Sequence, residues 1–378
     1  MAIADVERRV DVCIFYRNLN AGGVARVFVE LANGLAAKGL TVQFLLDSRG
    51  SMLEAQLDSG VEVVTQTRKG RIGRLLGLVS HIRGTKPRNL LTAVVNFNVV
   101  AVVAHLMTGR RTRLTITEVA DPVSDFRNSG TWLYPLNYLL VPILYRFATG
   151  IVAVSEGLAG RIARLALVGR HRVRVVHNPI FKPQLLEMSQ APLQHRWADR
   201  RQNLVITAGR LVLQKNQATL LKAFAIVSRR SPDARLIVLG EGPLKANLLD
   251  LTRQLALDGC VEFVGVDPNP FRWFSRASVF ALSSLGEGFG NVLVEAMACG
   301  CTPVSTDCRW GPREILANGE YGTLVPVGDH GALAEAILAA LENPRDRGQM
   351  LRRATEFSVE KSVAGYLELL ALREIERP

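Results

Sequence analysis

The chain has 378 residues and a formal net charge of +12, and this length is sufficient for two domains with separate hydrophobic cores. Its five cysteines are an odd number, and the first ten residues lack the apolar core of a signal peptide, so the sequence predicts a reduced, cytoplasmic protein. Cys299 and Cys301 have neither the C-x-x-C spacing nor a second ligand pair nearby, which argues against a structural metal site.

Most of the excess positive charge lies in the first half of the chain. Residues 1–180 contain 23 Lys and Arg against 12 Asp and Glu, whereas residues 181–378 contain 23 against 22. This asymmetry favours an anionic partner, either nucleic acid or a membrane surface, and a basic protein kept soluble by its charge is the alternative. Because no known nucleic-acid-binding motif is present, we expect no nucleic acid partner.

Two apolar stretches in this half raise the question of a membrane. Residues 90–109 are interrupted by Asn96, Asn98 and His105, which favours a buried strand running into a buried helix over a membrane span. Residues 131–147, TWLYPLNYLLVPILYRF, mix aromatic residues and leucines with prolines. This second stretch predicts either a segment at a membrane interface or a part of the core, and both alternatives stay open.

Strands and helices alternate along the whole chain, which predicts an α/β fold with parallel sheets. In the first half, the sequence predicts a helix over 24–38 and strands over 10–16, 41–47, 61–66, 90–96, 113–119, 150–156 and 173–179. In the second half, it predicts helices over 218–230 and 243–257 and strands over 204–210, 235–242, 261–266, 279–284, 302–306 and 322–326.

The polar stretch 183–202 has little periodicity and predicts a linker. It separates an N-terminal domain over residues 1–182 from a C-terminal domain over residues 203–357. An amphipathic helix within residues 358–378 is expected to pack back toward the N-terminal domain. Two α/β domains of this kind leave a cleft where their sheet ends face each other, and that cleft is the default ligand site.

The stretch 283–306 combines a glycine-rich loop, a helix start and two carboxylates. Its loop 286–290 contains Glu287, and the three glycines permit positive φ angles and a close approach of the backbone to a ligand. The apolar helix that follows is expected to begin at Asn291 as its N-cap. Because a helix that is apolar on every side is buried, Glu295 within it needs a partner. That partner is either a ligand or a buried arginine, with Glu287 solvated in the second case.

The first strand of the second half runs into Gly209 and Arg210, and Lys215 follows. An arginine can bind a diphosphate with two hydrogen bonds and a lysine can add a point charge, so these residues predict a nucleotide diphosphate site. Glu241, in a turn after the next strand, and Gly265 are candidates for the edge of a nucleobase, and plain turns fit equally well. No Asp-x-Asp pattern for a divalent metal stands in a suitable place, so we expect neither a metal nor another cofactor.

Taken together, these residues resemble those of the family 4 glycosyltransferases, which are retaining enzymes of the GT-B fold. The residues that carry the resemblance are Gly209–Arg210, Lys215, Gly240–Gly242, Glu287–Gly290, Glu295–Gly300 and Gly311–Glu314. The match covers essentially the whole chain and is densest over residues 204–328. It implies two Rossmann-like, doubly wound parallel-sheet domains that face a central cleft.

The resemblance also implies roles for individual residues in the C-terminal domain. Arg210 and Lys215 would hold the donor diphosphate and stabilise the leaving group. Glu295 would accept the ribose hydroxyls, and Glu287 would hold hydroxyls of the transferred sugar together with backbone N–H groups of its loop. The remaining donor-binding residues would be Gly209, Glu241, Gly265, Gly288, Phe289, Gly290 and Asn291.

In the N-terminal domain the same resemblance implies contacts to the phosphates and the acceptor. The turn Gly22-Gly23 would lie beside them, and Glu118 and Asp121 are candidates for acceptor contact. Many family members have His or Arg where this chain has Val119, so direct polar help from that position is not expected.

The predicted activity is transfer of a hexosyl unit from a nucleoside diphosphate sugar, expected to be a UDP-sugar, to an acceptor hydroxyl with retention. The basic first half and the stretch 131–147 favour a lipid-linked glycan of the cell envelope as acceptor, with peripheral contact to the inner face of the membrane, and a soluble sugar acceptor is the alternative. A nucleotide-sugar epimerase and a non-catalytic, membrane-associated nucleotide-sugar-binding protein are the rival functions. A glycosidase also uses paired carboxylates, but it has no use for Arg210 and Lys215.

Overall fold

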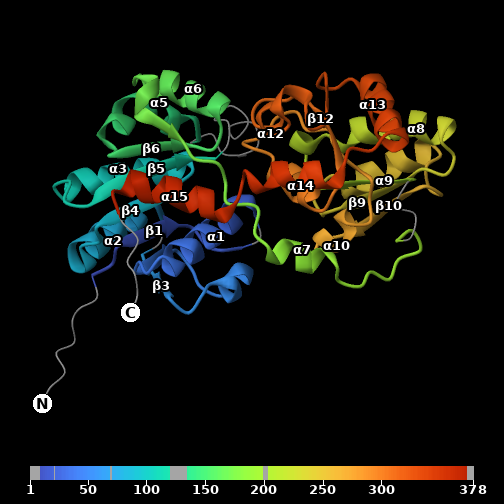
Figure 1. The fold of residues 1–378 in the computed structure, drawn as a ribbon. Helices are drawn as coiled ribbons and strands as arrows, with labels where there is room; N and C mark the ends of the chain where they lie inside the picture. Colours follow the sequence, from blue (N-terminus) through green and yellow to red (C-terminus); the bar gives the residue numbers. More distant parts are fainter. Residues whose placement is uncertain (1–8, 21, 69, 120–133, 199–202, 373–378) are drawn as a thin grey trace, which may run out of the picture. The chain divides into compact units, whose positions relative to one another are not determined.

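The computed structural model describes residues 9–20, 22–68, 70–119, 134–198 and 203–372. The chain divides into two compact units, one formed by residues 1–179 with 359–378 and the other by residues 180–358. Each unit contains its own parallel sheet with helices around it (Figure 1). The α/β class predicted from the alternation of elements is therefore confirmed.

The sheet of the N-terminal unit has seven strands in the order β3-β2-β1-β4-β5-β6-β7. The strands are β1 (Val12–Tyr16), β2 (Val42–Leu46), β3 (Val61–Thr65), β4 (Asn89–Ala93), β5 (Arg113–Glu118), β6 (Gly150–Ala153) and β7 (Val173–Val175). Every neighbouring pair is parallel. Because helices cover both faces of a parallel sheet, its inner strands bury all their side chains, as β2 and β4 do.

Six helices accompany this sheet among the residues that the structure describes. They are α1 (Gly23–Ala37), α2 (Gly70–Thr85), α3 (Val95–Met107), α5 (Tyr134–Leu144), α6 (Glu156–Leu165) and α15 (Val359–Leu370). Helices α2, α3 and α5 pack beside one another, and α15 packs on α1. The C-terminal helix is therefore a part of the N-terminal unit.

The two apolar stretches of this unit fold differently. Residues 90–109 form most of β4 and all of α3, as the prediction of a strand and a buried helix requires. Of the second stretch, the structure describes residues 134–147. They combine features of both predicted alternatives: Tyr145 is fully buried, as in a core segment, whereas Leu139 and Ile143 are 69% and 56% exposed, as in an interfacial segment. No helix in the described part of the chain is long and apolar enough to cross a membrane.

The C-terminal unit contains a six-stranded sheet in the order β10-β9-β8-β11-β12-β13. Its strands are β8 (Leu204–Ala208), β9 (Arg235–Leu239), β10 (Val261–Gly265), β11 (Val279–Leu282), β12 (Thr302–Thr306) and β13 (Thr323–Val325). Its helices are α7 (Gln184–Ser189), α8 (Gln217–Arg230), α9 (Lys245–Gln254), α10 (Phe271–Phe274), α11 (Asn291–Ala298), α12 (Pro312–Ile315), α13 (His330–Glu342) and α14 (Arg347–Thr355). All six predicted strands are present.

The predicted linker 183–202 is not a free connection where the structure describes it. Helix α7 packs against α10, and Trp197 is buried with only 5% of its surface exposed. Arg196 donates two hydrogen bonds to Glu262 of β10, at 3.0 and 2.7 Å. The sequence did not predict these contacts because apolar residues are sparse in this stretch. Residues 183–198 belong to the C-terminal unit.

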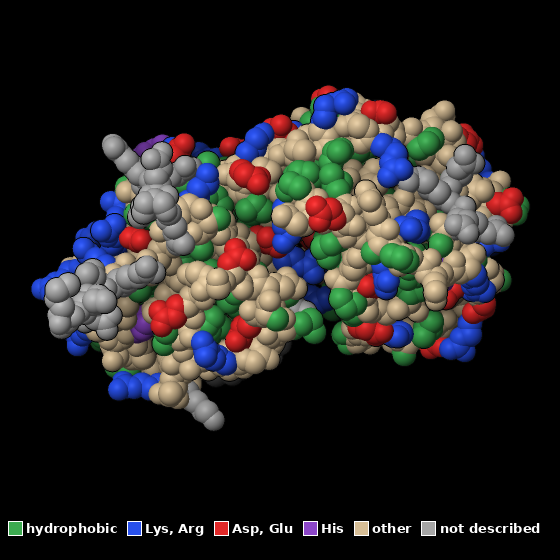
Figure 2. Space-filling view, turned by 60° about the horizontal axis from the view of Figure 1, so that its bottom comes forward, with side chains coloured by type: hydrophobic (Ala, Val, Ile, Leu, Met, Phe, Trp, Pro, Cys, Tyr) green, Lys and Arg blue, Asp and Glu red, His purple; other side chains and the backbone are tan. Residues whose placement is uncertain are grey.

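Both sheets have a point at which the chain reverses the direction in which it adds strands. In the N-terminal unit this point lies between β1 and β4, and in the C-terminal unit it lies between β8 and β11. Loops that leave the carboxyl ends of such neighbouring strands diverge, which makes this the usual ligand position in open α/β sheets. On the face shown in Figure 2, basic side chains are spread over both units among acidic ones.

Candidate functional site

Two loops meet beside the reversal point of the C-terminal sheet. One follows β8 and contains a 3-10 turn (Leu213–Lys215), and the other follows β11. The backbone N–H of Leu285 donates to the carbonyl of Gln214 at 2.8 Å, and the Gln214 amide returns a 2.7 Å bond to the carbonyl of Gly286. The Ser283 hydroxyl also donates to the carbonyl of Lys215 at 3.0 Å. These bonds join the two loops into one rigid element.

The joined loops hold a buried ion pair between Lys215 and Glu287. Lys215 Nζ lies 2.6 Å from Glu287 Oε1, and the side chains are only 19% and 8% exposed. The Ser284 hydroxyl donates to the same oxygen at 2.5 Å. The other oxygen, Oε2, accepts no hydrogen bond from a described residue. Because Lys215 and Ser284 both donate to Oε1 of Glu287, Oε2 is available to accept a hydrogen bond.

The backbone of Glu287 is fixed by the loop that follows β12. Its N–H donates to the carbonyl of Arg309 at 2.6 Å, and its carbonyl accepts from the N–H of Trp310 at 2.9 Å. Gly311 comes next, with a φ of 92°, and a Cβ on it would lie 1.8 Å from the carbonyl oxygen of Phe289. Only glycine allows these loops to come so close, which explains the first residue of the Gly311–Glu314 motif.

Helix α11 begins directly after this loop. Gly290, in the left-handed conformation, is its N-cap, so the prediction that Asn291 is the cap was wrong by one residue. The predicted burial of the whole helix was also wrong, because Asn291, Val292 and Glu295 are half-buried. Their spacing puts them on one side of the helix, and the core lies on the other. Glu295, in the middle of α11, is therefore partly accessible and not enclosed.

The β9 loop borders the same region. Gly240 packs so tightly that a Cβ on it would lie 2.0 Å from the carbonyl oxygen of Gly209. Glu241 is exposed, pairs with Lys245 at 2.6 Å, and lies within 3.2 Å of the position that a Cβ of Gly265 would take. The structure thus brings the predicted residues of three neighbouring loops together at this sheet edge.

Arg210 differs from Lys215 in its surroundings. It is exposed, and its guanidinium makes no hydrogen bond or ion pair with any residue in the described ranges. Its carbonyl accepts a 3.0 Å bond from the Gln217 side chain, which fixes the backbone beneath it. The site therefore offers one cation held in an ion pair and one cation that has no partner among the described residues. Phe289, by contrast, is 2% exposed and packs on Phe357, so only its backbone can face a ligand.

The N-terminal candidates are less uniform. Gly22 and Gly23 are exposed where α1 begins. Glu118 is only 3% exposed and accepts hydrogen bonds from Asn98, at 2.8 Å, and from the Tyr145 hydroxyl. Its carboxylate thus has partners inside the unit, which the sequence analysis did not anticipate, and the acceptor role assigned to it stays a prediction.

Two other N-terminal predictions have different outcomes. Asp121 lies outside the described residues. Val119 is half-buried and packs against the core of the N-terminal unit. Over the described ranges no cluster of three or more His, Cys, Asp or Glu side chains is placed to hold a metal ion.

Sequence reasoning missed the residues that support the ion pair. Gln214 and Ser284 carry no motif of their own, and the bond of Gln214 to Gly286 becomes visible only once the two loops are adjacent. Cys308 was also missed as a neighbour of the pair: burial, with a smaller contribution from the Glu287 charge, raises the pKa of its thiol to about 12. A serine two residues after a buried strand is the one available signal for Ser284.

Models of known protein families match both halves of the chain. The model for "Glycosyl transferases group 1" matches residues 194–357, and the model for "Glycosyltransferase Family 4" matches residues 21–181. The chain belongs to glycosyltransferase family 4, and its two parallel-sheet units are those of the GT-B fold.

Individual relatives are similar over different shares of their length. One relative is N-acetylgalactosamine-N,N'-diacetylbacillosaminyl-diphospho-undecaprenol 4-alpha-N-acetylgalactosaminyltransferase of Campylobacter jejuni. The chain is 33% identical to it over 251 residues, and this match covers 66% of each of the two chains. The chain is 28% identical to the lipopolysaccharide core biosynthesis glycosyltransferase LpsE of Rhizobium meliloti, covering 93% of this chain and 96% of that one. The chain thus spans just under two thirds of the first relative and nearly all of the second.

A solved structure has the same fold. Anabaena HepE, crystallised in complex with UDP and glucose, superimposes with a TM-score of 0.79 at 20% identity, covering 95% of this chain and 99% of that one. At this level of identity the likeness concerns the fold alone.

Proposed function

We propose that the protein is a retaining glycosyltransferase that moves a hexosyl unit from a UDP-sugar to an acceptor hydroxyl. The observation that carries the proposal is the buried Lys215–Glu287 pair at the reversal point of the C-terminal sheet, in a chain of glycosyltransferase family 4. The exposed Arg210, which has no partner among the described residues, follows the same strand, β8. A site with two cations and one oriented carboxylate suits a ligand that is a diphosphate at one end and a sugar at the other.

The donor is divided among these residues as follows. Arg210 and Lys215 bind the diphosphate, and Glu287 accepts a hydroxyl of the sugar through its available oxygen Oε2. Glu295, half-buried on α11, accepts the ribose hydroxyls. The backbone of Gly209, Gly265, Gly288, Phe289 and Gly290, with Glu241 and Asn291, borders the same ligand.

The chemistry requires that negative charge be stabilised as the nucleoside diphosphate departs. Arg210 and Lys215 supply preorganised positive charge at the phosphate, and the start of α11 adds the N–H groups of a helix N-terminus. No side chain is placed as an obvious nucleophile among these residues, so the acceptor hydroxyl attacks from the face that the phosphate leaves, and the departing phosphate takes its proton. The reaction in this proposal needs no metal and no other cofactor.

The acceptor in this proposal is a lipid-linked glycan, handled by the N-terminal unit at a membrane surface. The name of the Campylobacter relative refers to a diphospho-undecaprenol acceptor, and that of the Rhizobium relative to lipopolysaccharide core biosynthesis. Exposed Leu139 and Ile143 on α5 offer an apolar contact beside Arg146, which suits an anionic interface. A soluble sugar acceptor is the alternative. It would be favoured if the protein does not bind anionic vesicles at low salt.

Thermal unfolding with a panel of nucleotide sugars tests the donor assignment. A UDP-sugar at about 100 times its dissociation constant should raise the melting temperature by roughly 3 to 8 °C, and ADP- and GDP-sugars should have smaller effects. No shift with any nucleotide sugar would contradict the proposal.

Product analysis then separates the rivals. A transferase forms product only with donor and acceptor together, and NMR of the new linkage reports whether the anomeric configuration is retained. An epimerase converts the donor alone, and a non-catalytic binding protein gives a thermal shift without product.

A further inference from the structure

The N-terminal unit contains a cavity of about 590 Å³ at the carboxyl ends of β1, β2 and β3. Its lining includes Arg17, Asn18, Asp47, Arg49, Arg68 and Arg74. Four arginines and one aspartate leave an excess of three positive charges on the walls. Helix α2 begins at Gly70, another lining residue, so the free N–H groups of its first turn lie at the cavity as well.

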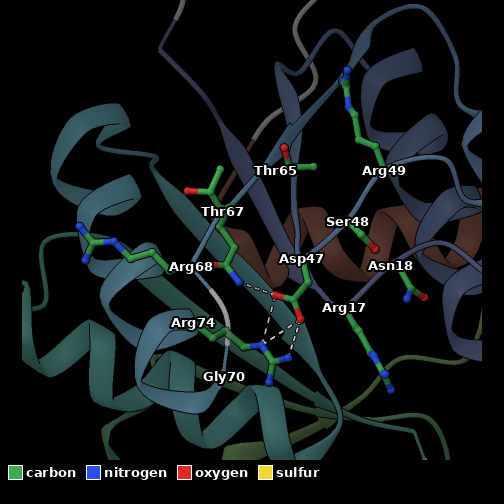
Figure 3. A pocket seen from close by; sticks show the side chains of 11 residues that line it. Arg17, Asn18, Asp47, Ser48, Arg49, Thr65, Thr67, Arg68, Gly70 and Arg74 are labelled. Atoms are coloured by element: carbon green, nitrogen blue, oxygen red, sulfur yellow. Dashed lines mark hydrogen bonds and ion pairs between the residues drawn. The ribbon is translucent and has the colours of Figure 1, made fainter.

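One arginine of the cavity is already fixed in place. Arg74 Nε lies 3.0 Å from Asp47 Oδ2, and Gln66 donates to Asp47 Oδ1 at 2.7 Å. The Arg74 guanidinium also lies 4.7 Å from the centre of the Phe97 ring. These contacts tie the start of α2 to the end of β2 and make the floor of the cavity rigid (Figure 3).

The other arginines keep their charge uncompensated. Arg49 donates to the carbonyl of Val63, which satisfies a hydrogen bond but carries no negative charge. Arg17 and Arg68 are exposed, and no described residue forms a hydrogen bond or ion pair with either guanidinium. Their side chains start on opposite sides of the Asp47–Arg74 pair and extend away from it, and because both are exposed they are free to turn toward a ligand (Figure 3).

We propose that this cavity binds a phosphate or diphosphate group of the acceptor, with Arg17 and Arg68 as its main ligands. Planar guanidinium groups match phosphate oxygens with paired hydrogen bonds, and a helix N-terminus adds to the attraction. Two free arginines on either side of a fixed one suit a diphosphate better than a single carboxylate. The proposal rests on the glycosyltransferase function and deepens it by naming the anionic group of the acceptor.

The cavity and the proposed donor residues belong to different structural units, and the cavity lies on the β2 side of β1. A phosphate there has two chemical sources: the headgroup of a lipid-linked sugar or a soluble sugar diphosphate. Ile72 and Leu76, on the α2 helix that starts at the cavity, are 75% and 40% exposed and offer an apolar surface for a lipid.

Protection from arginine modification tests the location of the site. The full chain is treated with phenylglyoxal with and without inorganic pyrophosphate, and the labelled arginines are identified by mass spectrometry. We expect pyrophosphate to slow labelling of Arg17 and Arg68, and not that of Arg111 and Arg113, which are exposed at the amino end of β5. Equal labelling of Arg17 and Arg68 in both conditions would overturn the proposal, and this readout needs no transferase activity.

Kinetics test the role of the site in transfer. The double variant Arg17→Gln, Arg68→Gln should raise KM for a diphosphate-bearing acceptor at least about tenfold, because two charge-assisted contacts are lost. UDP binding and kcat should stay unchanged, as should all parameters of the control variant Arg111→Gln, Arg113→Gln. An unchanged KM for the acceptor in the Arg17→Gln, Arg68→Gln variant would overturn the proposal. If protection occurs but no donor supports transfer, the glycosyltransferase function fails and the anion site stands.

The source of the phosphate is read from the same protection assay. Phosphatidylcholine vesicles that carry a polyprenyl diphosphate sugar should protect Arg17 and Arg68, and plain phosphatidylcholine vesicles should not. Protection by a soluble sugar diphosphate alone would assign the soluble source, and protection by neither would overturn the site.

Discussion

Two buried carboxylates stand at the carboxyl edges of the two sheets, and they are held by different kinds of partner. Glu287 faces an ammonium group, with Lys215 Nζ 2.6 Å away. Glu118, the last residue of β5, accepts hydrogen bonds from the neutral groups of Asn98 and Tyr145. Burial alone is therefore common to both residues, and the partner distinguishes them.

The difference in partner has consequences for what each residue can do. A carboxylate that is neutralised by a lysine forms an ion pair with two charged groups. Each group can also contact a ligand of opposite sign while the ion pair stays in place. A carboxylate held by neutral donors fixes the elements that carry those donors, here α3 and the turn after α5. These contacts support the ligand site proposed at Glu287 and favour a stabilising role for Glu118 in the N-terminal unit.

Removal of Lys215 should have the largest effect. Lys215→Ala leaves Glu287 buried without its counter-charge, which should lower the free energy of unfolding by about 2 to 4 kcal/mol, and the loss of positive charge at the phosphate should reduce kcat by a factor of about 100 to 1,000. Urea denaturation and steady-state transfer measure the two quantities.

Lys245→Ala is the matched control for this variant. It breaks a Lys–Glu pair of the same 2.6 Å length, but both of its side chains are more than a third exposed, so the cost should stay below about 1 kcal/mol. Equal losses in the two variants would mean that the buried position of the Lys215–Glu287 pair has no special importance.

Gly311→Ala should disturb the same carboxylate through the backbone. The added Cβ would lie 1.8 Å from the Phe289 carbonyl oxygen, so the loops that fix Glu287 must separate. We expect a loss of about 2 to 4 kcal/mol in stability and at least tenfold weaker UDP binding. Gly319→Ala is the control, because Gly319 also has positive φ but has no atom within 4 Å of the added Cβ. If both variants lose the same stability, backbone strain and not close packing explains the requirement for Gly311.

The fold was predictable because its determinants are local. VFAL in β11 is apolar throughout and VQFLL in β2 has a single polar residue, and parallel strands buried on both faces require such nearly continuous apolar runs. The position of Arg210 and Lys215 after β8 was equally predictable, since a chain reversal places the end of the first strand at the ligand edge.

The remaining features depend on contacts between segments that are distant in sequence. The backbone bonds between residues 309–310 and Glu287 arise only after β12 has packed beside β11. The Asp47–Arg74 pair is separated by 27 positions and joins a strand end to a helix start. No local pattern states such a pairing, and the same holds for Glu118 with Tyr145.

Tyr145→Phe tests the conclusion about Glu118. The substitution removes one donor from a buried carboxylate and leaves the packing of the ring intact, so stability should fall by about 1 to 3 kcal/mol. Because Glu118 is assigned a structural role, kcat and the acceptor KM should stay the same. A higher KM for the acceptor with unchanged stability would instead support the acceptor contact that the sequence analysis assigned to Glu118. Leu139→Ala, on the exposed side of α5, serves as the control for nonspecific effects on this helix.

The smallest effect concerns Cys308, and it should be visible only at alkaline pH. Burial, and to a lesser degree the Glu287 charge, raises the pKa of this thiol from 9.0 to about 12. The folded protein therefore holds the proton more tightly than the unfolded chain does, so the stability linked to this group is fully present below pH 9 and is lost as the pH rises toward 12.

Cys308→Ala should reduce this alkaline loss. Urea denaturation at about pH 7.5 and about pH 10.5 measures it, with Cys260→Ala as the half-buried control. An alkaline loss that is the same in Cys308→Ala and in the unsubstituted protein would show that the thiol beside Glu287 does not sense the surroundings of the ion pair.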